Sequence, residues 1–317
     1  MRLASTKALL NAGAITVNID TTAPVDWTRF AYIQYVTNTA YLCNSVMLFE
    51  TLHRLHSKPE RLMMYPSIFS VNDTDSTEGR LLRKARDEYN VKLAPVEVQS
   101  RPGGDPTWSE SYTKLLAFNQ TQYNRVLSLD SDSTVLQPMD ELFHLPPCPL
   151  ALPRAYWLDL SSRTLSSQLM LIQPSENEFT RVMAAVSTAT SSEYDMNIIT
   201  EIYRDSALIL PHRPYNLLTG EFRSKEHTAY LGSETERWDA ERVLAEARFL
   251  HFSDWPVPKP WIAASPAILR DHQPTCDKDP ETQGGEEGDC RERDLWLGFY
   301  EDFARRRKEV CDIDVGR

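Results

Sequence analysis

Two aspartates separated by one serine, Asp130-Ser131-Asp132, are the residues whose types and spacing best suit a chemical role. They follow an apolar stretch, Arg125 to Leu129, that is typical of a short β-strand. Because side chains at i and i+2 of a strand point to the same side, the two carboxylates are expected to converge at its carboxyl end. Open α/β sheets bind ligands at that edge. Two carboxylates there suit a hard divalent cation, which can hold the diphosphate of a nucleotide-sugar.

The same residues allow other interpretations. Aspartate is common, so a solvated strand end or a helix N-cap explains the pattern without any function. Residues 130–134 also spell D-x-D-x-T, the nucleophile motif of haloacid-dehalogenase-like phosphatases. That fold carries the motif on its first strand and needs a later acidic pair after another strand. Here three expected strands precede the motif, and the late candidate, Gly288-Asp289, lies in a hydrophilic tail.

The elements that must position the aspartates alternate between strands and helices. We expect strands at 30–36, 61–65, 91–98, 125–129, 165–173, 207–210 and 249–252. We expect helices from Asn44 or Ser45 to about 55, at 78–89, at 109–122, from Ser175 to about 189, from Asp195 onward, and at 291–310. The first hundred residues therefore read β-α-β-α-β, which is typical of a parallel sheet with crossover helices.

Composition limits the partners and the compartment. The chain has 317 residues and a net charge of −11, which argues against nucleic acid or an anionic membrane as the main partner. No apolar run reaches the length of a membrane span, and the N-terminus is a poor signal peptide. The chain is therefore either cytosolic or preceded by an anchor in the natural gene product. Three of the five cysteines, Cys276, Cys290 and Cys311, lie in the tail and suggest a disulfide and an oxidising compartment.

Four segments, in this order along the chain, resemble glycosyltransferase family 8, the group that includes glycogenin. The resemblance is strongest to its fungal branch, described as α-1,2-N-acetylglucosaminyltransferases. The segments are YIQYVTNTAYLCNSVMLFETL, YTKLLAFNQTQYNRVLSLDSDSTVLQPMDELF, SSQLMLIQPS and LHFSDWPVPKPW. They span about residues 27–262. We therefore expect an irregular lead-in over 1–26, one glycosyltransferase domain over 27–262, and an acidic, Cys-containing loop and helix over 263–317 that pack on the domain.

The resemblance implies a fold and a donor site. The fold would be α/β of the GT-A type, with a mixed, mostly parallel central sheet flanked by helices. Asp130, Asp132 and His251 would bind a divalent metal, usually Mn²⁺, and an imidazole with two carboxylates suits that ion. Lys259 matches the lysine that holds the diphosphate of a UDP-sugar, where its charge would stabilise the leaving UDP. Ser131 lies between the two aspartates and is expected to border the same nucleotide.

Further residues match the donor pocket of the family. Lys114 matches the lysine placed against the donor sugar and phosphate, and Thr37 and Asn38 match the position that lines uracil and ribose. Asp195 is our candidate for the carboxylate nearest the reacting carbon. Two motifs differ from the family: Ser166-Ser167-Gln168 replaces the frequent Asn-Ser-Gly, and Asp195-Met196-Asn197 replaces Asp-Gln-Gly. These differences leave the sugar specificity and the nucleophile open.

The implied reaction is a metal-dependent, retaining transfer of GlcNAc from UDP-GlcNAc to a hydroxyl of a mannose residue in a glycan. Glucose and galactose are the other sugars that the donor could carry. The resemblance implies a Golgi or secretory location, and a membrane contact only through an anchor outside this sequence. A non-catalytic relative that binds a nucleotide-sugar or glycan is the alternative. Four tryptophans could stack on sugars, although burial is the commoner fate of this residue: Trp108, Trp157, Trp255 and Trp261.

Overall fold

The computed structural model describes residues 24–100, 109–276 and 289–315, so nearly all of the expected lead-in, and Trp108, lie outside the described residues. Its main feature is a seven-stranded sheet with the strand order β3-β2-β1-β4-β7-β6-β8. β7 runs antiparallel to its neighbours β4 and β6, whereas the other neighbouring pairs are parallel. The expected mixed, mostly parallel sheet is therefore confirmed. The strands are β1 (Phe30–Tyr35), β2 (Glu60–Pro66), β3 (Val91–Val96), β4 (Arg125–Leu129), β6 (Leu150–Pro153), β7 (Leu169–Ile172) and β8 (Leu208–Leu210).

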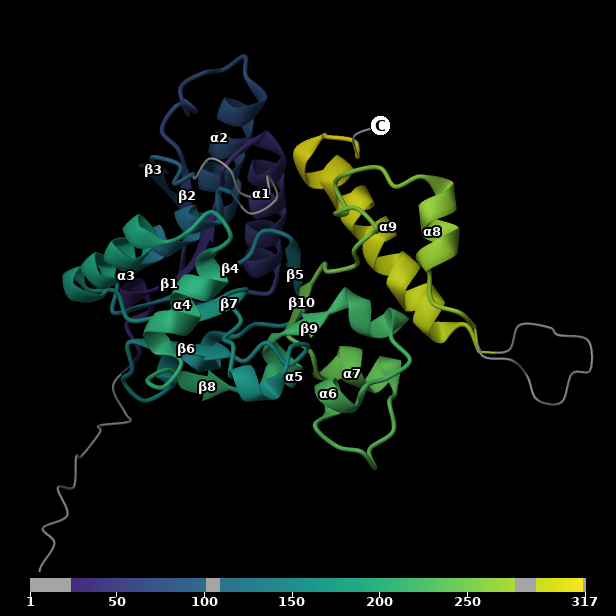
Figure 1. The fold of residues 1–317 in the computed structure, drawn as a ribbon. Coiled ribbons are helices and arrows are strands. Elements are labelled where there is room, and N and C mark those ends of the chain that lie inside the picture. Colours follow the sequence, from purple (N-terminus) through teal and green to yellow (C-terminus); the bar gives the residue numbers. More distant parts are fainter. Residues whose placement is uncertain (1–23, 101–108, 277–288, 316–317) are drawn as a thin grey trace, which may run out of the picture.

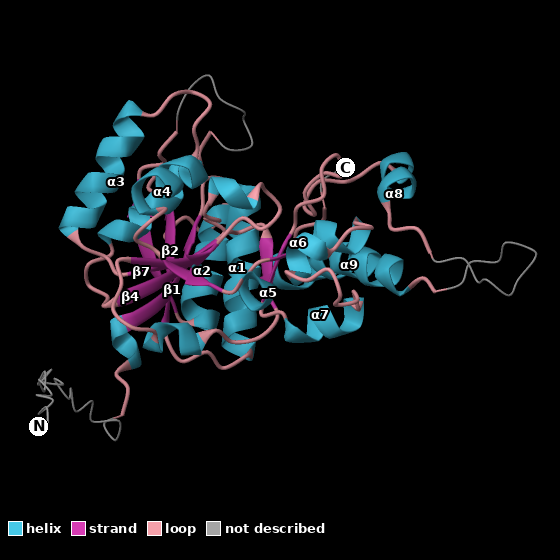
Figure 2. Ribbon diagram, turned by 60° about the horizontal axis from the view of Figure 1, so that its bottom comes forward, coloured by secondary structure: helices cyan, strands magenta, loops and turns pink. Residues whose placement is uncertain are grey.

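Helices cover both faces of this sheet, as Figure 2 shows. Alternate residues of a strand point to opposite faces, so Tyr32 and Leu127 join one hydrophobic core while Ile33 and Val126 join the other. The first core is closed by α1 (Thr39–Arg54) and α2 (Thr77–Tyr89). The second is closed by the 3₁₀ helix η2 (Ser111–Asn119), α3 (Glu176–Thr188) and α4 (Asp195–Tyr203).

A second, three-stranded sheet lies beside the first and has the order β5-β10-β9. It consists of β5 (Ser133–Val135), β10 (Phe249–His251) and β9 (Leu217–Leu218). β10 is antiparallel to β5, with His251 opposite Ser133. This pairing brings the segment after β10 next to the aspartates that follow β4.

The remaining short helices of the described residues are η1 (Trp27–Arg29), η3 (Asp140–His144), η4 (Leu160–Ser162), α5 (His212–Tyr215), η5 (Thr219–Arg223), α6 (Thr228–Leu231), α7 (Ala240–Glu246) and α8 (Pro266–His272).

The long helix α9 (Arg291–Cys311) lies beside α1, as the yellow and purple helices of Figure 1 show. The side chain of Arg307 on α9 donates to Asn44 Oδ1 on α1 at 2.6 Å. A disulfide joins Cys43 of α1 to Cys311, and a second disulfide joins Cys276 to Cys290. The tail therefore does contain a disulfide, as its cysteines indicated. Among the described residues, no helix combines the length and the apolar character needed to cross a bilayer.

Several element boundaries differ from the predicted ones. α1 begins at Thr39 rather than near Asn44, because the Asn38 side chain caps it by accepting from the Ala40 and Tyr41 N–H groups at 3.0 and 3.2 Å. Asn44 is buried inside the helix, where its partner is the distant Arg307. The predicted helix at 109–122 is the 3₁₀ helix η2, and the predicted strand at 165–173 contracts to β7. β6 was not predicted, since the neighbouring prolines indicated a break in the chain.

Candidate active site

Asp130 and Asp132 lie directly after β4, at the carboxyl edge of the large sheet. β1 pairs with β2 on one side and with β4 on the other, so the edge between β1 and β4 is a topological switch point, where such sheets bind ligands. The backbone here is held in place. Gln34 of β1 donates to the Leu129 and Asp130 carbonyls at 3.3 and 3.1 Å, and the Asp130 N–H donates to the Gln168 carbonyl at 2.9 Å.

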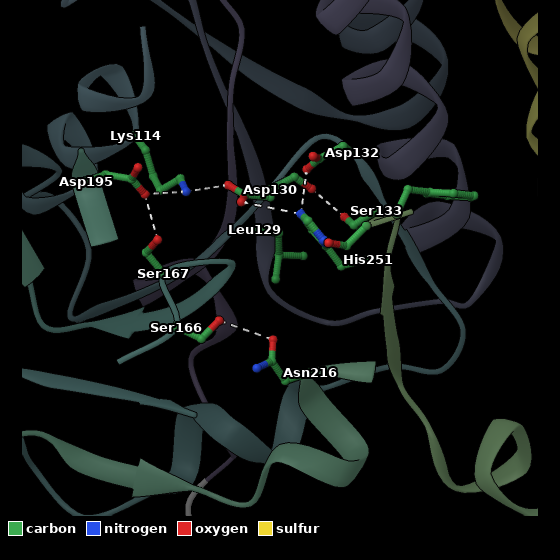
Figure 3. Close-up of polar contacts among 12 residues, drawn as sticks. Lys114, Leu129, Asp130, Asp132, Ser133, Ser166, Ser167, Asp195, Asn216 and His251 are labelled. Carbon is green, nitrogen blue, oxygen red and sulfur yellow. Dashed lines mark hydrogen bonds and ion pairs between the residues drawn. The ribbon is translucent and has the colours of Figure 1, made fainter. Parts of the chain in front are cut away.

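His251 completes a group of three side chains that could hold a metal ion. Its Nε2 lies 3.0 Å from Asp132 Oδ1 and 3.8 Å from Asp130 Oδ2. One ligand atom from each of the three residues lies within 4.8 Å of the others (Figure 3). The backbone supports this arrangement, because the Phe252 N–H donates to the Asp132 carbonyl at 2.9 Å. Two carboxylates and an imidazole fit a divalent transition-metal ion.

The two aspartates have opposite pKa shifts. Burial raises the pKa of Asp130 to about 6, against the lowering influence of Lys114, and the nearby Asp132 charge adds to the rise. Burial alone would also raise the pKa of Asp132. The charges of His251 and Lys259 outweigh it and hold that pKa well below its usual range. Asp132 is therefore the more acidic of the two carboxyl groups.

Lys114 is a buried cation between two carboxylates. Its Nζ lies 2.7 Å from Asp130 Oδ1 and 2.7 Å from Asp195 Oδ2, as Figure 3 shows. Burial tends to lower the pKa of this lysine, but the two carboxylates overcome it and raise that pKa above its usual value. Asp195 also accepts from Ser167 Oγ at 2.6 Å. Burial raises the pKa of Asp195, and the Lys114 charge and the hydroxyl contacts reverse this to a net lowering. Asp195 is therefore ionised at neutral pH.

Lys259 lies on the other side of Asp132 and is more open to solvent. Its Nζ is 2.7 Å from Asp132 Oδ2 and donates to the Phe252 carbonyl at 2.6 Å. The Lys259 side chain is 28% exposed, compared with 4% for Lys114. Of the two lysines, Lys259 is thus the one that a solvent-borne anion can reach without unpacking the core.

The other predicted site residues border the same edge. Thr37 and Asn38 follow β1, and the Asn38 side-chain oxygen is occupied by the N-cap of α1. Ser131 is buried, and its Oγ has no hydrogen-bond partner among the described residues. The sequence did not indicate that Gln34 would hydrogen-bond the backbone around Asp130, or that Ser167 would donate to Asp195. A glutamine inside the apolar stretch of β1 was the available signal for a buried polar role.

The tryptophans proposed to stack on sugars differ in exposure. Trp261 is 9% exposed and packs against Tyr41 and Phe303. Trp157 is half-buried against Tyr156. Trp255, between His251 and Lys259 in the chain, is 90% exposed. Of these three, only Trp255 presents its ring to solvent.

Known proteins resemble this chain in sequence and in fold. No family model matches the chain. A protein named glucose N-acetyltransferase 1 from Gibberella zeae is 59% identical over 299 residues, which cover 92% of this chain and 64% of that protein. The chain therefore spans just under two thirds of that relative's length. A protein of the same name from Aspergillus fumigatus is 46% identical over 303 residues, covering 90% of this chain and 78% of that protein.

A solved structure of the bifunctional glycosyltransferase WbbM has a TM-score of 0.57 and 14% sequence identity, and the match covers 91% of this chain and 51% of that one. At this identity the likeness concerns the fold alone, and it confirms the expected GT-A type of fold. The sequence matches identify the group more closely than the fold does. The chain belongs to the fungal family of proteins named glucose N-acetyltransferase 1.

Proposed function

We propose that this chain is a metal-dependent, retaining glycosyltransferase of family 8, which transfers N-acetylglucosamine from UDP-N-acetylglucosamine to a hydroxyl of a glycan, on mannose. The observation that carries the proposal is the group Asp130, Asp132 and His251 at the switch point of a glycosyltransferase fold, with a lysine on each side. The names of the fungal relatives support N-acetylglucosamine as the transferred sugar.

The donor diphosphate would bind between the metal group and Lys259. Asp130, Asp132 and His251 would hold the divalent ion, Mn²⁺, with Ser131 beside the nucleotide. When bound, that ion supplies positive charge that stabilises the departing UDP. Lys259 already touches Asp132, and its side chain is partly exposed, so it is placed to add a second positive charge to the diphosphate as the glycosidic bond breaks.

The donor sugar would lie toward Lys114 and Asp195. Both groups are charged and buried, and an oriented buried charge stabilises a transition state better than a solvated one. We propose that Asp195, or a backbone carbonyl, stabilises the oxocarbenium-like anomeric carbon. Lys114 would contact the donor sugar and phosphate. Thr37 and Asn38 would line the uracil and ribose. Since the Asn38 oxygen caps α1, its amide N–H group is the part free to donate to the nucleotide.

The remaining assignments concern the acceptor, the compartment and the division of the chain. Trp255 is our candidate for stacking on the acceptor glycan, because its ring is exposed beside the donor residues in the chain. Two disulfides support folding in the secretory pathway, with the Golgi lumen as the proposed location. We place the catalytic domain at 27–262 and the Cys-containing tail that packs on it at 263–317.

The test is UDP release from a panel of UDP-sugars with Mn²⁺, with and without EDTA, for the wild type and for Asp132→Asn. We expect turnover with UDP-N-acetylglucosamine and a mannose-containing acceptor, lost with EDTA and in the variant. Tight UDP binding without turnover of any donor would favour the non-catalytic relative. Release of inorganic phosphate from simple phosphate esters would favour the phosphatase motif instead.

A further inference from the structure

The segment that follows His251 forms a closed loop, and its two ends meet at the site. Lys259 Nζ at one end donates to the Phe252 carbonyl at the other at 2.6 Å. Inside the loop, the Val257 N–H donates to the Asp254 carbonyl at 2.9 Å. The position of Lys259 relative to Asp132 therefore depends on how this loop is held.

Asp254 anchors the loop through a fully buried carboxylate, whose side chain has 0% exposure. Oδ1 accepts from Trp296 Nε1 at 2.9 Å, and Oδ2 accepts from Tyr300 OH at 2.9 Å. Thr219 Oγ1 also donates to Oδ2, and Arg223 Nη1 donates to the Asp254 backbone carbonyl at 2.7 Å. A buried carboxylate is tolerated only when it is paired and hydrogen-bonded in this way. This carboxylate makes no contact with the metal group.

Two of these donors belong to α9. Trp296 and Tyr300 are four residues apart, so they project from the same face of the helix. α9 is in turn fastened to α1: Arg306 Nη2 donates to Thr51 Oγ1 at 2.6 Å, and Cys311 is bonded to Cys43. α1 starts at the end of β1, next to the aspartates. A continuous set of contacts thus runs from the site, through α1 and α9, back to the loop that ends in Lys259.

We propose that Asp254 is a positioning residue for the donor site: it fixes the loop between His251 and Lys259 to α9, so that both side chains stand beside Asp132 before the donor binds. The part of the test that measures UDP affinity rests on the proposed function, because it requires that the site bind UDP. It gives α9 a role at the donor site, carried by the hydrogen bonds of Trp296 and Tyr300 to Asp254.

The test removes single hydrogen-bond donors from Asp254: Tyr300→Phe leaves the packing intact, whereas Trp296→Phe also removes part of a fully buried ring. Tyr300→Phe and Trp296→Phe each delete one donor to Asp254, and Tyr123→Phe is the matched control. Tyr123 OH donates to Glu60 Oε2 at 2.8 Å, which is also a phenol-to-carboxylate bond, at the amino end of β4. The measurements are the calorimetric dissociation constant of UDP with Mn²⁺ and amide hydrogen exchange of the peptide covering 252–262 in the free protein. Asp254→Asn is measured alongside.

We expect both α9 variants to weaken UDP binding on the order of tenfold, about the worth of one buried hydrogen bond. We also expect faster exchange in 252–262, with neither change in Tyr123→Phe. Unchanged UDP affinity and exchange in both α9 variants would refute the proposal, as would an equal loss in the control. If Asp254→Asn does not fold, the α9 variants decide. If the wild type binds no UDP, the proposed function fails, and the exchange data alone decide whether Asp254 fixes the loop.

Discussion

The carboxylates of Asp130 and Asp195 share one ammonium group, with Lys114 Nζ 2.7 Å from each. Asp130 follows β4, Asp195 opens α4, and Lys114 lies on η2, so the ion pairs join elements that are separate in the chain. A candidate metal ligand and the candidate for the reacting face of the sugar are therefore fixed relative to each other.

Lys114→Met is expected to lower both stability and activity, because it leaves two buried carboxylates without their cation. Removing one partner of a buried ion pair costs about 3–5 kcal/mol of unfolding free energy. Urea denaturation would measure it. Lys92→Met, which removes an exposed pair with Glu60, is the control and should shift the midpoint little. Equal midpoints for the two variants would show that the buried pair does not stabilise the site.

Asp132→Asn is expected to abolish the effect of metal on UDP binding. In the wild type, EDTA should weaken UDP binding. The variant should bind UDP about 10–100 times more weakly with Mn²⁺ and respond little to EDTA. Titration calorimetry provides the measurement. Asp205→Asn, which alters an exposed pair with Arg163, should behave as the wild type. Full EDTA sensitivity in Asp132→Asn would remove this residue from the metal group.

Trp255→Ala is expected to raise the KM for the acceptor and leave the KM for the UDP-sugar unchanged. Loss of an aromatic stacking contact is worth roughly 2- to 10-fold in affinity. Trp255→Phe keeps an aromatic ring and should recover most of the affinity. Initial-rate kinetics with each substrate varied in turn would separate the two constants. A rise in the donor KM alone would assign Trp255 to the nucleotide side.

Loss of the Cys43–Cys311 disulfide is expected to destabilise the protein more than loss of Cys276–Cys290. The first pair is separated by 268 residues in sequence and the second by 14, and the chain-entropy stabilisation by a cross-link grows with loop length. The paired Cys→Ser variant at 43 and 311 should lose about 2–5 kcal/mol. Thermal denaturation of both double variants without reductant would rank them. The opposite order would mean that the packing of α9 on α1 already provides what the first disulfide adds.

The sequence predicted the parts of the fold that depend on local pattern. The apolar stretch before Asp130 marks β4 at its observed bounds, and Ser175 caps α3 as expected. Structural features that depend on residues distant in the chain could not be predicted from it. Nothing near Asn44 in sequence indicates that its buried side-chain oxygen will accept a hydrogen bond from Arg307.

The candidate site divides in the same way. The two aspartates stood out from their spacing after an apolar strand, but the resemblance was needed to favour a metal site there, and to identify His251 and Lys259 at all. Asp254 was not singled out, because its partners Trp296 and Tyr300 lie on a helix that reads locally as a charged amphipathic surface helix. A buried carboxylate is recognisable only once those partners are placed around it.

The Cys43–Cys311 disulfide also sets an order of events during biosynthesis. At about 5–20 residues per second, ribosomes need roughly 13 to 54 seconds to translate the 268 residues between the two cysteines. Cys43 has no native partner during that interval, and Cys148, the cysteine left unpaired in the folded structure, is made before Cys311. In an oxidising compartment, pairing of Cys43 with an earlier-made cysteine such as Cys148 would compete with the native disulfide, and an oxidoreductase that reverses it would raise the yield of the native protein.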